Sequence, residues 1–111
     1  MSERELKIAH TEALFRDVNE RIAESVAHAG HGAADLVCEC ADPMCTERIS
    51  VELDEYEEVR GDGTQFVLAP GHELAAVERV VARKADYQVV QKVERAVAEV
   101  ARRLNPRTRP A

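Results

Sequence analysis

Residues 35–53 read DLVCECADPMCTERISVEL, and the pattern of this stretch organises the rest of the chain around it. Residues 35–40 have the composition of a short strand, and residues 47–53 alternate polar with apolar side chains, as a half-buried strand does. Between them, Asp42 and Pro43 are residues that favour turns. The stretch therefore predicts a β-hairpin that carries three cysteines at its closed end.

Cys38, Cys40 and Cys45 form the strongest chemical signal, with the spacing C-x-C-x4-C. Residues i and i+2 of an extended strand point to the same side, so Cys38 and Cys40 aim at one point, and the turn at Pro43 returns Cys45 towards them. Cysteines that simply pack as small buried side chains are the alternative. Three converging thiolates are soft ligands, however, and suit zinc or an iron–sulfur cluster.

A structural zinc site takes four ligands, so the cysteines need a fourth side chain. His72 is the residue that we favour, because it follows a predicted strand and the turn-forming pair Pro70-Gly71. His31, seven residues before Cys38, is the alternative. We therefore expect a closed Cys3His site for Zn²⁺, with a [2Fe–2S] cluster on the same ligands as the alternative cofactor.

Catalysis at this metal is not expected. A catalytic zinc needs an open coordination position and a general base, and three thiolates make zinc a poor Lewis acid. Glu39 and Glu73 are carboxylates adjacent to the predicted ligands, but their spacing does not match the H-x-E and P-C-x-x-C pattern of nucleobase deaminases. The sequence therefore predicts no enzyme.

The remainder of the chain predicts helices at both ends and further strands between them. In residues 4–29, Leu14, Val18, Ile22 and Val26 recur every four residues, as on the inward face of an amphipathic helix. We expect an α+β fold, in which a small antiparallel sheet packs with a long N-terminal, a short middle and a C-terminal helix. The other predicted elements are a helix at 55–60, strands at 64–69, 77–83 and 87–93, and a helix at 94–104.

Length and charge limit the kinds of protein that this can be. The chain has 111 residues and a formal net charge of −6, which fits one domain and disfavours non-specific nucleic-acid binding. We expect the domain to span residues 1–104, followed by an Arg-rich disordered tail at 105–111. No stretch resembles a transmembrane segment or a signal peptide, so we expect a cytoplasmic protein, in which cysteines seldom form disulfides.

Five short motifs occur together: FRDVNERI at 15–22, the C-E-C-x4-C cluster, EYEEVR at 55–60, FV at 66–67 and PGHE at 70–73. Together they resemble a group of small bacterial proteins with no established activity. The similarity covers most of residues 14–92. It supports the integrity of the cysteine–histidine site and implies nothing about function.

These features lead us to expect a non-enzymatic binding or regulatory module that acts on a protein partner of unknown identity. Pairing of two copies through the N-terminal helix is a further interaction that we consider. The alternative function is a redox or metal sensor, because exposed thiolates at a strand end can be oxidised and then release zinc.

Overall fold

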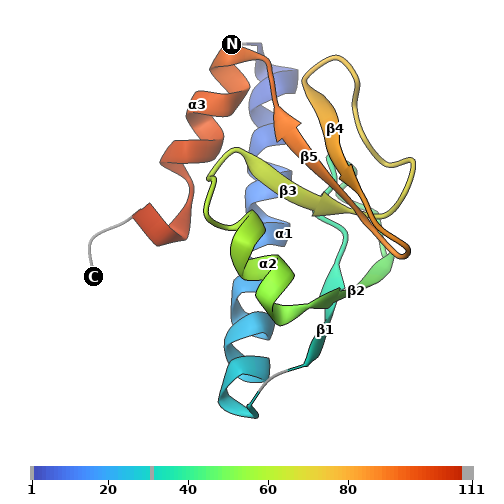
Figure 1. The fold of residues 1–111 in the computed structure, drawn as a ribbon. Helices are drawn as coiled ribbons and strands as arrows, with labels where there is room; N and C mark the ends of the chain where they lie inside the picture. The colour runs from blue at the N-terminus through green and yellow to red at the C-terminus, as the bar shows by residue number, and fades with distance from the viewer. Residues whose placement is uncertain (1, 31, 109–111) are drawn as a thin grey trace.

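The computed structural model describes residues 2–30 and 32–108, and it has the α+β architecture that the sequence predicts. Figure 1 shows the longest helix running behind the strands, with the C-terminal helix beside its N-terminal half. The elements are α1 (Glu3–His28), β1 (Ala33–Val37), β2 (Arg48–Glu52), α2 (Leu53–Val59), β3 (Gln65–Leu68), β4 (Glu78–Arg83), β5 (Gln88–Lys92), α3 (Arg95–Arg103) and a 3-10 turn, η1 (Pro106–Thr108).

The strands form two antiparallel sheets, where the sequence predicted one. β1 pairs with β2 as the predicted hairpin, and the second sheet has the order β3-β5-β4. The strand predicted at 35–40 ends at Val37 because the chain then changes partner. The Cys38 N–H still donates to the Glu47 carbonyl at 3.1 Å, but the Glu39 N–H donates to the Val67 carbonyl of β3 at 2.9 Å. The segment between the first two cysteines therefore joins the two sheets.

The inward face of α1 is not the apolar stripe that the sequence predicted. Leu14 is 63% exposed and Val18 is 38% exposed, while Ile22 and Val26 are partly buried against the core. Small alanines allow the helix to approach the sheets closely, so that longer polar side chains between them reach partners on other elements. The buried positions of α1 are Ala9, Glu12, Ala13, Arg16, Asn19 and Ala23.

Arg16, which a simple helical projection places on the outer surface, is buried at the centre of this face. Its guanidinium donates to the carbonyls of Gly63 and Ala101, both at 2.8 Å, and its Cζ lies 4.5 Å from the centroid of the Phe66 ring. Arg16 thus connects α1 to the loop before β3 and to α3.

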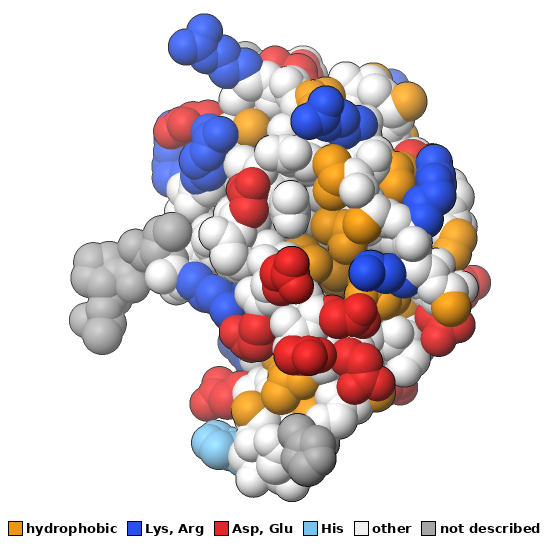
Figure 2. Space-filling view, viewed as in Figure 1, with side chains coloured by type: hydrophobic (Ala, Val, Ile, Leu, Met, Phe, Trp, Pro, Cys, Tyr) orange, Lys and Arg blue, Asp and Glu red, His pale blue; other side chains and the backbone are white. Residues whose placement is uncertain are grey.

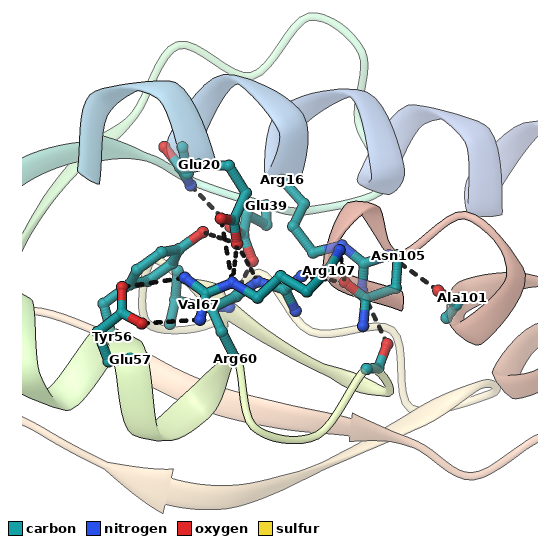
Figure 3. Close-up of polar contacts among 12 residues, drawn as sticks. Arg16, Glu20, Glu39, Tyr56, Glu57, Arg60, Val67, Ala101, Asn105 and Arg107 are labelled. Carbon is teal, nitrogen blue, oxygen red and sulfur yellow. Dashed lines mark hydrogen bonds and ion pairs between the residues drawn. The ribbon is translucent and has the colours of Figure 1, made fainter. Parts of the chain in front are cut away.

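A second group of polar contacts joins Arg107, close to the C-terminus, to α1 and α2 (Figure 3). Arg107 pairs with Glu20 at 3.0 Å and with Glu57 at 2.7 Å, and Arg60 also pairs with Glu20. These ion pairs raise the pKa of Arg107 and lower the pKa of Glu57. Arg107 and the turn η1 that contains it lie within residues 105–111, the stretch that the sequence predicted to be a disordered tail; residues 109–111 lie outside the described residues.

The carboxylates around α2 occupy one face of the molecule, where Figure 2 shows acidic side chains below a band of hydrophobic ones. Glu55 accepts a hydrogen bond from the Tyr87 hydroxyl at 3.1 Å and lies 3.8 Å from the Lys84 ammonium. Glu55 thus makes local contacts at the surface. Among the residues that the structure describes, no helix has both the length and the apolar character that crossing a bilayer requires.

A buried charged triad holds α1 against the second sheet. The Lys92 ammonium binds Glu12 Oε2 of α1 at 2.6 Å and Glu78 Oε1 of β4, and all three side chains are buried. Two carboxylates thus face one ammonium, and Glu12 Oε1 has no hydrogen-bond partner among the described residues. Burial, opposed by Lys92, raises the pKa of Glu12 from 4.5 to about 7.

This raised pKa makes stability depend on pH. Because the pKa of Glu12 is higher in the folded than in the unfolded chain, its contribution to stability is complete below about pH 4.5 and is lost as the pH rises through about 7. We expect Glu12→Gln, which cannot titrate, to gain up to about 3 kcal/mol relative to the wild type between about pH 5 and about pH 8.5. Urea unfolding of both proteins at each pH measures this difference; a difference that does not change with pH would contradict the prediction.

Candidate metal centre

Two of the four predicted ligands, Cys45 and His72, each lie at the end of a turn that contains a proline. In the first, the Cys45 N–H donates to the Asp42 carbonyl at 3.1 Å across Pro43, and Asp42 Oδ1 accepts from the Met44 N–H at 2.9 Å. This is the turn chemistry expected for Asp followed by Pro. Cys45 is the fourth residue of this turn, which returns it towards Cys38 and Cys40 as the sequence predicted.

The second turn follows β3 and ends at His72. The His72 N–H donates to the Ala69 carbonyl at 3.2 Å, with Pro70 and Gly71 in the centre of the turn. Gly71 has a φ of +85°, which is the left-handed conformation that the third residue of a type II turn requires and that glycine adopts without strain. His72 therefore occupies the same place in its turn as Cys45 does in the first.

Cys38 and Cys40 are held from the other direction, by α1. Asn19 Nδ2 donates to the Val37 carbonyl and to Glu39 Oε2, and Asn19 Oδ1 accepts from the Val37 N–H, all at 2.8 Å. Asn19 thus fixes the Val37 backbone before Cys38 and the Glu39 side chain after it. With Glu39 turned towards α1, the side chains on either side of it, Cys38 and Cys40, point the other way.

The structure brings the four side chains together at distances that suit one metal ion. The sulfurs of Cys38, Cys40 and Cys45 and a ring nitrogen of His72 all lie within 4.8 Å of one another. His72 Nδ1 is 3.5 Å from Cys38 Sγ and 3.7 Å from Cys45 Sγ. Zn–S bonds of about 2.3 Å and Zn–N bonds of about 2.0 Å in a tetrahedron place sulfur and nitrogen roughly 3.5 Å apart. His31, the alternative fourth ligand, lies outside the described residues.

The site is buried on one side and accessible on the other. Cys38 is 1% exposed and Cys40 is 2% exposed, whereas Cys45 and His72 are half-buried. Cys40 and His72 also line a cavity of about 480 Å³, together with Arg4 and Ile8 of α1. Small molecules in solution can therefore approach the ligands from this side.

The protonation state of the thiols depends on what they bind. Burial raises the pKa of the thiols of Cys38 and Cys40, so without a cation both carry their protons at neutral pH. A metal ion would displace these protons, and its affinity would therefore fall as the pH is lowered. Cys38 Sγ also accepts a hydrogen bond from the Ala69 N–H at 3.1 Å, which suits a sulfur that carries negative charge.

Sequence reasoning missed most of the side chains that support the ligands. Glu39, noted only as a carboxylate next to two ligands, accepts hydrogen bonds from Asn19 at 2.8 Å and from the Val67 N–H at 2.9 Å. Glu73 is bound by Gln88 Nε2 of β5. A helical spacing of polar residues, such as Arg16 and Asn19, was the one available signal that α1 has a buried polar face.

Comparison of the chain with protein-family models, curated proteins and solved structures finds no match. The chemistry of the Cys3His group therefore has to be judged from the ligands and their surroundings.

Proposed function

We propose that the Cys3His group holds one Zn²⁺ ion and that this ion stabilises a small binding or regulatory module. The observation that carries the proposal is that three sulfurs and one imidazole nitrogen meet within 4.8 Å, from three separate segments of the chain. Four protein ligands complete a tetrahedron, which is the arrangement of structural zinc. The resemblance to small bacterial proteins with the same motifs is consistent with a site of this kind.

The compactness of the group supports a single ion over the alternative [2Fe–2S] cluster. A two-iron cluster distributes its ligands over two metal atoms, whereas these four ligand atoms are all close to one another. The two nitrogen–sulfur distances, 3.5 Å and 3.7 Å, also agree with ligands on one tetrahedral centre.

A role in binding fits the ligand set better than catalysis does. Four protein ligands leave no coordination position for water, and the carboxylates of Glu39 and Glu73 already accept hydrogen bonds within the protein. The exposed apolar side chains Leu14 and Val18 of α1 offer a contact surface to a protein partner or to a second copy.

A reducing cytoplasm remains the proposed compartment, since the site uses free thiols.

Sensing of oxidants or metals is the second function that an observation favours. The cavity beside Cys40 and His72 gives small molecules access to the ion, and a zinc-bound thiolate that is oxidised loses its affinity for the metal. If the protein is a sensor, we expect mild peroxide to release zinc much faster than it does from fully buried structural sites.

Metal analysis of the native protein tests the main proposal. We expect native mass spectrometry and elemental analysis to find one zinc per chain. His72→Ala is expected to weaken zinc binding by more than about 100-fold, because it removes a direct ligand. His28→Ala, which replaces an exposed histidine at the end of α1, is the matched control and should bind as the wild type does. A visible absorption band from bound iron in fresh protein, or no bound metal, would contradict the proposal.

A further inference from the structure

His72 is the one predicted ligand that lies outside the connection between β1 and β2. Residues 69–77 connect β3 to β4 without regular secondary structure, and the turn at Pro70-Gly71 supplies a single backbone hydrogen bond to His72. The three cysteines lie in the connection between β1 and β2, residues 38–47, which the backbone hydrogen bond from Cys38 to Glu47 closes. The contacts of the residues that follow this turn therefore help to determine where the imidazole lies relative to the sulfurs.

The two residues after His72 are both bound by side chains of the second sheet. Glu73 Oε1 accepts a hydrogen bond from Gln88 Nε2 of β5, and the Leu74 N–H donates to Glu78 Oε2 of β4 at 2.9 Å. Gln88 and Glu78 are both buried, and their strands are neighbours in the sheet. The loop is thus fastened at two consecutive residues, directly beside the ligand.

Burial of the Glu78 carboxylate costs desolvation free energy, because the charged group loses its hydration. The Lys92 ammonium binds one of its oxygens, Oε1, and also binds Glu12 of α1. The other oxygen is the one that accepts from Leu74. The carboxylate is therefore oriented by Lys92 on one side and holds the loop on the other.

We infer that Glu78 and Gln88 are positioning residues for His72, and that their hydrogen bonds to residues 73 and 74 fix the imidazole in the geometry that closes the metal site. Neither side chain touches the metal ligands. This inference rests on the proposed function, namely that Cys38, Cys40, Cys45 and His72 hold one metal ion. Side chains that hydrogen-bond a metal ligand directly typically contribute 10- to 100-fold to metal affinity, and we expect an effect of about that order from these contacts to the adjoining residues.

Titration with Zn²⁺ and Co²⁺ tests the inference, because the visible absorption of Co²⁺ reports its ligands. We expect Glu78→Ala to bind both ions about 10- to 100-fold more weakly than the wild type and to shift the Co²⁺ spectrum towards that of His72→Ala. Glu78→Gln keeps an oxygen that can accept from Leu74 and should recover most of the affinity. Glu12→Gln is the matched control, since it changes the same buried triad without a bond to the loop and should leave affinity and spectrum unchanged.

Circular dichroism establishes first that each variant is folded. If Glu78→Ala does not fold, Glu73→Ala tests the contact to Gln88 instead, because Glu73 is only half-buried. Wild-type affinity and spectrum in whichever of these two variants is folded, alongside an altered His72→Ala, would overturn the inference and leave the proposed zinc site intact. A wild-type protein that binds neither ion would show instead that the proposed function is wrong.

Discussion

Removal of the proposed zinc ion is expected to lower the melting temperature by at least about 20 °C or to unfold the protein outright. Structural zinc sites in small modules provide apparent binding free energies of about 10–16 kcal/mol, whereas whole domains are stable by about 5–15 kcal/mol. In a chain of this length, each lost kcal/mol lowers the melting temperature by several degrees. Thermal unfolding followed by circular dichroism, before and after treatment with a strong chelator, measures the effect.

Cys45→Ser provides the control for this experiment. Cys45 is half-buried, so its replacement disturbs packing less than replacement of Cys38 or Cys40 would. The variant should melt at a low temperature already and should show no further change with chelator. A wild-type protein that melts at the same temperature after complete loss of metal would refute the claim that the ion stabilises the fold.

Replacement of Arg16 by methionine is expected to lower the free energy of unfolding by about 3 kcal/mol. Methionine keeps much of the apolar stem but leaves the carbonyls of Gly63 and Ala101 without their donor. It also removes the cation over the Phe66 ring. Burial lowers the pKa of Arg16 to about 10, so its loss recovers some desolvation free energy, but the two unpaired carbonyls outweigh this gain. Chemical denaturation at neutral pH measures the change.

Arg21→Met serves as the matched substitution on the same helix. Arg21 is exposed, so we expect its replacement to change stability by less than about 0.5 kcal/mol. Arg16→Lys should fall between wild type and Arg16→Met, since a single ammonium cannot span both carbonyls. Equal stability of Arg16→Met and Arg21→Met would mean that the buried contacts of Arg16 contribute nothing.

The convergence of the four metal-ligand candidates could be predicted from the sequence because short-range rules govern their positions. Asp42-Pro43 and Pro70-Gly71 are turn signals that act over four residues, and each places a ligand at the end of its turn. The strand alternation that points Cys38 and Cys40 to one side is equally local. Local preferences were sufficient here because the rest of the fold agrees with them.

The buried face of α1 could not be predicted in the same way. Leu14 and Val18 lie four residues apart, and Arg16 and Asn19 lie three apart. Both spacings fit one face of a helix, so periodicity alone leaves two faces to choose from, and hydrophobicity selected the wrong one at Leu14 and Val18. The partners of Arg16 are carbonyls 47 and 85 residues away along the chain. No local pattern contains that information. The change of partner at Glu39, which divides the strands into two sheets, depends on a similarly distant contact with Val67.

The position of the Cys38–Cys40 segment gives the proposed ion a mechanical role. Its backbone is bonded to Glu47 beside the hairpin at one residue and to Val67 of the three-stranded sheet at the next. An ion bound there would link the β1–β2 sheet to the three-stranded sheet. Its ligands would come from the connection between β1 and β2 and from the loop after β3, so loss of the ion would remove one of the links between the two sheets.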